Sequence, residues 1–437
     1  MCIEKLFFEL IQVAIGTRQS LSFAPSANQW SELFALSKKQ ALAAVTFCGV
    51  RALANIPVTH NLSEVTYLKW LGLTAKVAQR NKALNAECDC ICKEFAHDGL
   101  LPVVLKGQSN LVYYPEILRD CRTAGDIDLW CNVPEGVEVA HEVNGKVEKR
   151  EYRGMEGVIE YCKQYERCQG RDIPWHRVLY YHCELTSPEG IGIEPHYRPS
   201  YLNSPIRNYR LQRWFKDNEP WGMCDAKIDG HLFPILPIST NAIYQLLHIY
   251  KHLFEEGIGL RQLLDYYFVL RALHIEQGSF ADRAQSMGQW AEGMGVTVKS
   301  NEEIMHTLTR FGMKKFAGAV MHVLQTVFDP SQPSLKGKES LDWQKRWPWM
   351  ICEPNEKEGK FLLNEILQAG NFGKYDDRIA RGAKNFMGFK VSGSISHAIE
   401  KTKHNLRLLK HYPEEALWEP FFRVYHWIWR KLELWRY

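Results

Sequence analysis

The stretch from Leu101 to Trp130, LPVVLKGQSNLVYYPEILRDCRTAGDIDLW, decides the fold of this chain. It opens with a short apolar run, Leu101–Leu105, whose length and adjacent valines are typical of a buried strand. The polar turn Lys106–Ser109 follows, and its Gly107 lets the backbone approach a ligand closely. After a segment that favours a short helix, Gly125–Trp130 is a second predicted strand. This order of elements indicates a core that mixes strands and helices.

Two acidic residues, Asp126 and Asp128, alternate with apolar residues on the second predicted strand. Because strand side chains alternate between faces, both carboxylates are expected on the same face. Neighbouring carboxylates repel each other, and a divalent cation removes that cost. Mg²⁺ commonly takes one or two carboxylates together with substrate phosphates. For this pattern alone, two solvated aspartates on an edge strand are the alternative.

A third carboxylate is predicted from a β-hairpin further along the chain. The strand Val178–Leu185 leads into the turn Ser187–Gly190 and then into a second strand. On that second strand Ile191 and Ile193 share one face, which puts Glu194 on the other. Glu194 taken alone is also consistent with an ordinary surface acid.

The order of elements resembles the core of the polymerase-beta-type nucleotidyltransferases. More narrowly, the motifs resemble a bacterial family known only as uncharacterised nucleotidyltransferases. The matching residues are Leu105-Lys106-Gly107, Tyr114-Pro115, Arg119, Arg122–Leu129 and the E-x-H-x-R element Glu194-x-His196-x-Arg198. The chain departs from the wider superfamily by placing Gln108 after the glycine and by a longer interval before Asp126.

The resemblance implies an enzyme that moves a nucleoside monophosphate from a nucleoside triphosphate (NTP) to a hydroxyl or phosphate acceptor, which the sequence does not identify. It implies that Asp126, Asp128 and Glu194 are catalytic and hold Mg²⁺ or Mn²⁺. The candidates for the NTP phosphates are Lys106, Gly107, Gln108, Ser109, Arg119 and Arg122. The candidates for other substrate contacts are His196, Arg198, His248, His252, Arg261 and Asp265. A catalytically inactive nucleotide-binding or scaffold protein on the same fold is the alternative.

The pattern of apolar residues predicts an α+β protein in which a small mixed sheet is flanked by two large helical regions. We expect an N-terminal helical region over residues 1–98 and a nucleotidyltransferase-like core with inserted helices over 99–238. Within that core, the polar segment from Asn132 to Arg171, in which Glu and Lys are dense over Glu135–Glu151, is expected to form one or two helices with solvated faces. A C-terminal helical region is expected over 239–437.

The overall composition is that of a globular protein. The 437 residues carry a net charge of only +4, which gives no strong signal for nucleic acid. The 12 cysteines follow no regular framework, and we find neither a secretory signal nor a membrane span. We therefore expect a cytoplasmic protein.

The C-terminal tail differs in charge from the rest of the chain. From Arg378 to Tyr437 there are 12 Lys and Arg residues against 5 Glu, a net charge of +7. Its aromatic residues fall on one helical stripe between Trp418 and Trp435. Residues 414–437 are therefore a candidate for peripheral membrane or protein contact. Packing of the stripe into the core is the alternative.

Overall fold

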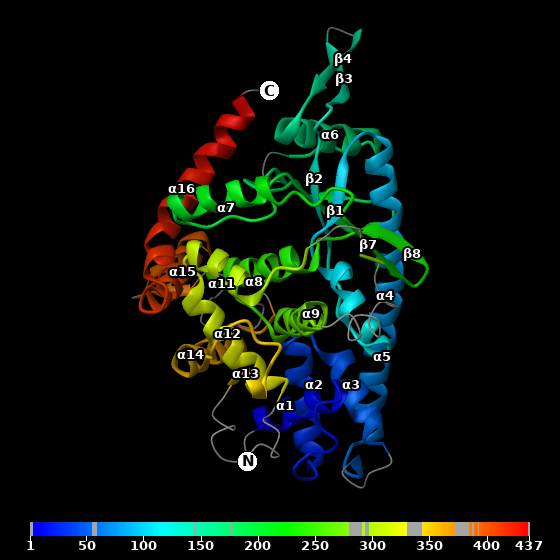
Figure 1. The fold of residues 1–437 in the computed structure, drawn as a ribbon, viewed down its shortest axis with the longest axis vertical. Coiled ribbons are helices and arrows are strands. Elements are labelled where there is room, and N and C mark those ends of the chain that lie inside the picture. The colour runs from blue at the N-terminus through cyan, green and yellow to red at the C-terminus, as the bar shows by residue number, and fades with distance from the viewer. Residues whose placement is uncertain are drawn as a thin grey trace.

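The structure, a computed structural model, describes residues 3–54, 59–143, 146–174, 177–278, 291–292, 297–329, 343–371, 384–386, 389–391 and 393–435. It confirms the α+β prediction, because a small sheet lies between groups of helices from both ends of the sequence (Figure 1).

The N-terminal helices are α1 (Ile3–Ala14), α2 (Ala27–Lys39), α3 (Ala43–Ala52) and α4 (Glu64–His97). α4 is 34 residues long and runs from the N-terminal helices to the sheet (Figure 1). The Ser63 side chain caps its first turn, and the indole of Trp70 donates to the carbonyl of Ala43 at 2.6 Å. Beyond its end, Gly99 takes a φ of +93°, which glycine adopts without steric cost.

The central sheet has the strand order β1-β2-β6-β5. Its strands are β1 (Leu101–Val104), β2 (Ile127–Asn132), β5 (Leu185–Thr186) and β6 (Gly192–His196). β1 is antiparallel to β2, whereas β2 and β6 are parallel with Asp128 opposite Glu194. The sheet is therefore mixed, and its register brings acids from distant parts of the chain together.

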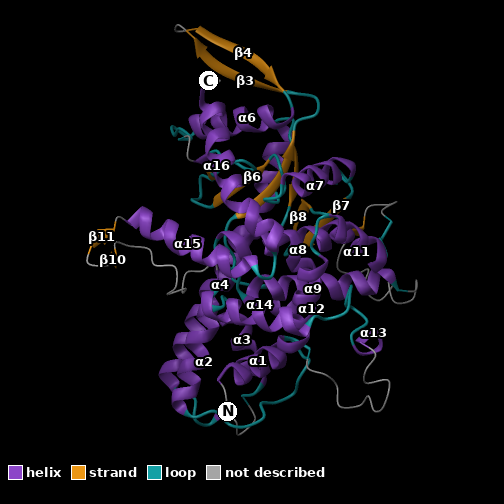
Figure 2. Ribbon diagram, turned by 90° about the vertical axis from the view of Figure 1, so that its left-hand side faces the viewer, coloured by secondary structure: helices purple, strands orange, loops and turns teal. Residues whose placement is uncertain are grey.

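The segment from Asn132 to Arg171, predicted to form one or two helices, contains a β-hairpin in its first half and one helix in its second half. The hairpin consists of β3 (Val137–Val143) and β4 (Lys146–Tyr152), and α6 (Gly154–Cys168) follows. Val137 and Val139 are buried, while Glu138 between them is exposed. Apolar residues therefore recur with a period of two among the charged ones. The hairpin projects away from the body of the molecule (Figure 2).

The hairpin predicted before Glu194 is also shorter than expected. Of the predicted first strand of this hairpin, only its end, Leu185–Thr186, pairs as a regular strand with β6. The preceding residues fold back on themselves, because Val178 bridges to Cys183 and the amide of Leu179 donates to the carbonyl of His182 at 2.8 Å. This tight turn competes with the continuous strand that the apolar pattern predicts.

The segment between β1 and β2 contains η2 (Gly107–Tyr113), a 3₁₀ helix, and the short α5 (Glu116–Arg119). A separate three-stranded sheet follows α7 (Pro205–Asp217) and consists of β7 (Cys224–Ile228), β8 (His231–Pro234) and β9 (Ala291–Glu292).

The C-terminal half is largely helical, as predicted. α8 (Ile238–Glu255) and α9 (Leu260–Gln277) are almost entirely buried at the centre of the molecule. The remaining elements are α11 (Asn301–Arg310), α12 (Lys314–Val327), α13 (Trp343–Arg346), α14 (Glu356–Ala369), β10 (Lys384–Phe386), β11 (Phe389–Val391), α15 (Gly393–Leu409) and α16 (Pro413–Trp435). Among the described residues, no helix has the length and apolarity needed to cross a bilayer.

Candidate active site

A cavity of about 640 Å³ lies between the central sheet and α8. Its lining includes Lys106, Asp126, Asp128, Glu194, His196, His248 and His252, all of which were predicted from the sequence. The volume falls in the range of small-molecule sites, roughly 300–1,000 Å³. Residues from three distant parts of the chain therefore share one space.

The sheet register explains why the three acids meet. Asp128 on β2 lies opposite Glu194 on β6. Asp126 immediately precedes β2, and a β-carbon built on Gly192 would lie 3.6 Å from the Asp126 β-carbon. Gly192 and Asp126 are therefore neighbours, and both line the cavity.

Asp128 is the most tightly held of the three acids. Its Oδ2 lies 2.8 Å from Lys106 Nζ, and its Oδ1 lies 3.2 Å from His196 Nε2. Burial opposes ionisation of this carboxyl, but Lys106 and His196 outweigh it and hold its pKa well below the ordinary value. Asp128 is therefore a carboxylate at neutral pH.

Glu194 is in the opposite electrostatic situation. Burial, followed by the negative charge of Asp128, raises the pKa of Glu194 to about 8. The cavity thus contains one firmly ionised acid beside one that gains or loses a proton near neutral pH. Such a pair of separated pKa values is characteristic of acid–base sites.

Lys106 owes its position to the glycine that follows it. Gly107 adopts a φ of +74°, in the left-handed region, and this conformation begins η2 directly after β1. The Lys106 side chain is only 15% exposed and points to Asp128. Its pKa is lowered by burial but raised more by Asp128, Asp126 and Glu194, so the net shift is upward.

The side chains of Gln108 and Ser109, predicted to contact NTP phosphates, are not among the residues that line this cavity. Both are buried. The Gln108 amide donates to Asn85 Oδ1 at 2.5 Å and so ties the turn to α4. Its side chain therefore supports the position of the turn.

Arg122 and Asp265, two further predicted residues, form a buried pair away from the cavity lining. Arg122 Nε and Nη2 donate to the two oxygens of Asp265 at 2.7 and 2.8 Å, and Tyr114 also donates to Asp265 at 2.6 Å. Arg261 donates to the carbonyl of Thr123 at 2.7 Å. These contacts join α9 to the loop before β2.

Arg119 and Arg198 are likewise outside the cavity lining. Arg119 Nε donates to the carbonyl of Tyr114 at 3.3 Å. The Arg198 guanidinium lies 4.3 Å from the ring centre of Tyr180 and 5.8 Å from that of Trp429 on α16. The predicted arginines therefore lie outside the cavity that Asp126, Asp128 and Glu194 line.

His248 and His252 from α8 complete the far wall of the cavity, with ring centres 4.3 Å apart. Burial lowers the pKa values of both rings well below the ordinary value, so both are neutral.

The sequence reasoning missed several residues of the cavity, and two of them, Lys251 and His182, carry groups that can bind a ligand. Lys251 lies on the same face of α8 as His248 and His252, and helical spacing could have identified it. His182 is brought in by an isolated antiparallel bridge to His196, which requires knowledge of the hairpin register.

Residues 26–291 match the model of a family described as uncharacterised nucleotidyltransferase. This match spans more than half of the chain and includes the central sheet, the cavity and helices α8 and α9. The chain therefore belongs to the uncharacterised nucleotidyltransferase family. No curated protein and no solved structure matches it.

Proposed function

We propose that this protein transfers a nucleoside monophosphate from an NTP to a hydroxyl or phosphate group of an acceptor, with Mg²⁺ or Mn²⁺ bound at the cavity. The observation that carries the proposal is the convergence of Asp126, Asp128 and Glu194 beside Lys106. Membership of a nucleotidyltransferase family supports the reaction class.

The donor set fits a divalent cation. Asp126, Asp128 and Glu194 offer oxygen ligands, which Mg²⁺ and Mn²⁺ prefer. Burial, and after it the charge of Asp128, raises the pKa of Glu194, and a positive ion would relieve the repulsion among the three acids. When bound, such an ion supplies stabilisation of the attacking and leaving oxygens in an in-line displacement.

The protein's own groups have separate tasks in this proposal. Lys106 and Lys251 place positive charge in the cavity, where the phosphates of an NTP would bind. His196 donates to Asp128 and keeps that carboxylate in position. Glu194 is suited to accept the proton of the acceptor hydroxyl, because its pKa lies near the working pH.

We assign the acceptor to a second cavity of about 260 Å³ that adjoins the first. The two cavities share the side chains of Tyr181, Lys251 and Glu255. The outer wall of the second cavity comes from α16, including Glu419 and Phe422.

The test is incubation of the protein with each of the four α-labelled NTPs, Mg²⁺ or Mn²⁺, and a cell extract. We expect one NTP to label a product in a metal-dependent manner and to raise the melting temperature of the protein. Both responses should be lost in Asp126→Asn/Asp128→Asn and kept in Asp217→Asn, a change to an exposed acid on α7. An unchanged response in the double variant would contradict the metal assignment.

A nucleotide-binding or scaffold protein without transfer activity is the second candidate. The Lys106–Asp128 ion pair favours it, because Lys106 already neutralises one of the proposed metal ligands. In that case an NTP would raise the melting temperature, but no product would be labelled. For either candidate we propose a cytoplasmic location, which the scattered cysteines of the sequence support.

A further inference from the structure

One side of the cavity carries a buried histidine, His182, to which the proposed nucleotidyl transfer assigns no role. His182 is 2% exposed, and neither of its ring nitrogens has a hydrogen-bond partner among the described residues. Leaving a buried polar group without a partner is unfavourable, so a buried imidazole of this kind requires an explanation.

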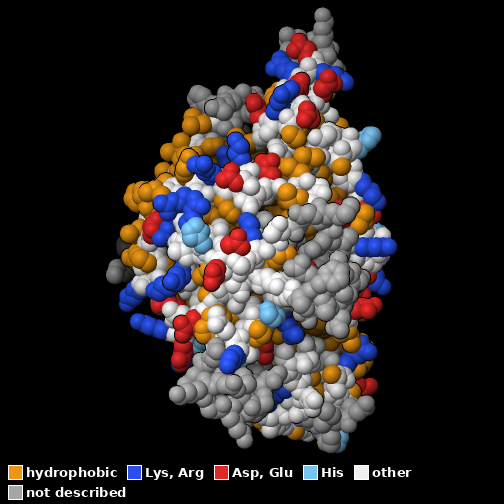
Figure 3. All heavy atoms as spheres, in the orientation of Figure 1, with side chains coloured by type: hydrophobic (Ala, Val, Ile, Leu, Met, Phe, Trp, Pro, Cys, Tyr) orange, Lys and Arg blue, Asp and Glu red, His pale blue; other side chains and the backbone are white. Residues whose placement is uncertain are grey.

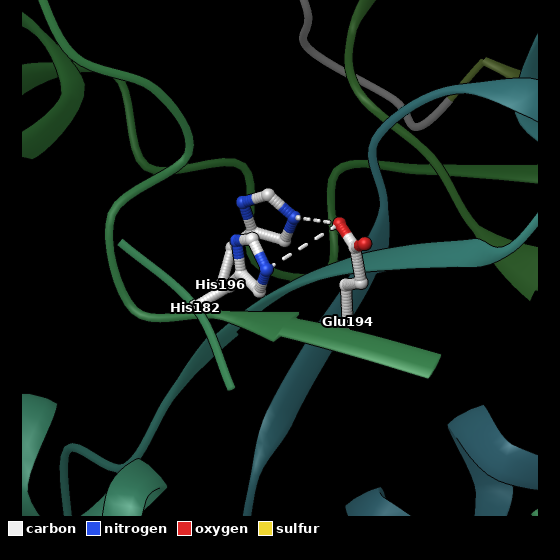
Figure 4. Close-up of side chains that lie close together, drawn as sticks. All are labelled: His182, Glu194 and His196. Carbon is white, nitrogen blue, oxygen red and sulfur yellow. Dashed lines mark ion pairs between the residues drawn. The ribbon is translucent and has the colours of Figure 1, made fainter. Parts of the chain in front are cut away.

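Sheet geometry directs His182 and its neighbours to one point. His182 bridges His196 in an antiparallel pair, which puts both rings on the same face with centres 4.8 Å apart. Glu194 precedes His196 by two residues on β6 and therefore shares that face. Figure 4 shows both rings directed at the Glu194 carboxylate.

The distances fit a tetrahedral metal ion. His196 Nε2 lies 3.5 Å and His182 Nε2 lies 3.8 Å from Glu194 Oε2, and the ligand atoms of the three residues all lie within 4.8 Å of one another. Two ligand atoms that are each about 2.1 Å from a tetrahedral zinc ion lie roughly 3.4 Å apart. Metal binding would displace the proton through which His196 Nε2 donates to Asp128 Oδ1 at 3.2 Å.

We propose that His182, His196 and Glu194 form a binding site for a divalent transition metal of the zinc type, distinct from the all-oxygen Mg²⁺ site of the proposed function. Two imidazoles and a carboxylate suit Zn²⁺ and Co²⁺, whereas Mg²⁺ prefers oxygen ligands alone. The two sites share Glu194, but zinc-type binding does not require that the protein transfer nucleotides.

The test uses Co²⁺, whose visible absorption reports nitrogen ligands and tetrahedral geometry. The full chain is treated with chelator and titrated with Co²⁺, with and without an excess of Mg²⁺. We expect tetrahedral Co²⁺ bands at one equivalent that Zn²⁺ abolishes and excess Mg²⁺ leaves in place. Bands that Mg²⁺ removes, or no bands, would overturn the proposal.

Variants locate the ion. His182→Ala should lose the bands. The control His231→Ala, which changes a histidine on β8 that is paired with Asp89 of α4, should keep them. Asp126→Asn should keep the bands while losing nucleotidyl transfer, so failure of one proposal is distinguishable from failure of the other. Loss of the bands in His252→Ala with retention in His182→Ala would place the ion at the α8 histidines and overturn the assignment. Circular dichroism checks that each variant folds.

A second and independent inference concerns the outer face of α16. Six large apolar residues lie exposed along this face, each between 43% and 67% accessible: Leu417, Phe421, Val424, Trp427, Ile428 and Leu432. Hydrophobic side chains gather along the edge of the molecule where α16 lies, with Lys and Arg side chains beside them (Figure 3). The opposite face packs against the body, where Phe422 stacks on Tyr201 with ring centres 4.6 Å apart.

The sequence left core packing and an external contact as alternatives for this stripe. In the structure, part of the stripe packs against the body of the molecule and part is exposed. Trp418 and Tyr425 border a groove of about 600 Å³ between α16 and α7, which extends the exposed apolar surface. Contiguous apolar surface of this kind marks an interaction site.

We infer that the outer face of α16 binds an anionic membrane surface. Charge complementarity selects this occupant, because the basic residues lie on the segment that leads into α16. Residues 378–410, which include the neighbouring helix α15, have eight Lys and Arg against one Glu, whereas residues 411–437 are balanced. An apolar helical face with interfacial tryptophan and tyrosine beside Lys and Arg is typical of helices that lie in the plane of an anionic bilayer.

Sedimentation with vesicles tests this inference. We expect the full chain to bind vesicles containing phosphatidylglycerol and not vesicles of phosphatidylcholine alone. Phe421→Glu/Ile428→Glu should reduce the binding at least tenfold, whereas the matched pair Val65→Glu/Leu68→Glu on the exposed side of α4 should not. Equal binding by the α16 variant, or self-association of the wild type that the α16 variant abolishes, would overturn the inference, the second by identifying another copy of the chain as the occupant.

Discussion

Two clusters of charge include residues of the segment that joins β1 to β2, and they differ in how their charges balance. In the first, Arg122 and Tyr114 satisfy both oxygens of Asp265 at 2.6–2.8 Å. In the second, Asp128 is paired with Lys106. Burial and the negative charge of Asp128 raise the pKa of the neighbouring Glu194 to about 8. The difference separates a structural cluster from one suited to bind a ligand.

The comparison also shows that one sequence motif serves both purposes. Arg122 and Asp126 are four residues apart, yet Arg122 joins helix α9 while Asp126 lines the cavity. A motif therefore identifies a region of the chain, and the direction of each side chain decides whether a residue is scaffold or site.

The largest expected effect comes from breaking the balanced cluster. Arg122→Met leaves the buried Asp265 carboxylate without its main partner, which costs roughly 3–5 kcal/mol of unfolding free energy. Urea unfolding measures this loss. The double variant Arg122→Met/Asp265→Leu should recover part of it, because the uncompensated charge is gone. No loss in the single variant would contradict the structural role.

The unbalanced cluster should respond in activity instead of stability. Asp128→Asn removes a proposed metal ligand, and we expect the rate of label transfer to fall on the order of 10²–10³-fold, as for loss of one key electrostatic group. Unfolding free energy should change less than in Arg122→Met. Asp217→Asn, at an exposed acid, serves as the control for transfer rate. An active Asp128→Asn enzyme would remove this residue from the mechanism.

Glu415, at the start of α16, is a further buried carboxylate, and its balance of charge can be compared with that of the two clusters. It accepts from the amide of Asn203 at 2.7 Å, but its nearest arginine nitrogen, on Arg207, is 3.9 Å away. Burial raises its pKa to about 7. Between pH 4.5 and 7 the folded state therefore holds a proton that the unfolded state has released, and stability falls as pH rises.

Wild type should lose about 2 kcal/mol more than Glu415→Gln between pH 5 and pH 7.5, because one pKa unit corresponds to about 1.4 kcal/mol. Urea unfolding of both proteins across this range measures the difference in slope. Parallel pH profiles would show that Glu415 titrates alike in the folded and unfolded chains.

The smallest expected effect is at Gln108, which the sequence suggested for phosphate contact and the structure joins to α4. Gln108→Leu should cost about 1 kcal/mol of unfolding free energy through its lost hydrogen bonds. The NTP concentration for half-maximal thermal shift should stay within twofold of wild type. A large loss of NTP binding with normal stability would return Gln108 to the site.

The sequence was sufficient where local periodicity determines the structure. The apolar run at Leu101 and the alternation around Asp128 and Glu194 predicted the strands and the face on which these acids lie. The positions of Asp126 and Lys106 could then be inferred, because Asp126 immediately precedes β2 and Lys106 lies just beyond β1. Backbone geometry over a few residues is enough for this kind of inference.

Other features depend on partners that local patterns do not reveal. Arg122 and Asp265 are 143 residues apart, so their pairing could not be derived from either segment alone. His182 reaches the cavity through a turn that interrupts a predicted strand. The hairpin β3–β4 was misjudged because its charged residues obscured an alternation of valines.

The long helix α4 has a consequence for any attempt to shorten the protein. Its first half carries Trp70 into the N-terminal helices, and its second half holds Gln108 through Asn85. Near its end Asp98 accepts from Tyr161 at 2.8 Å. Removing the first hundred residues would therefore remove the contact with Asn85 that holds the glycine turn in place. A shortened protein that keeps this turn has to begin upstream of α4.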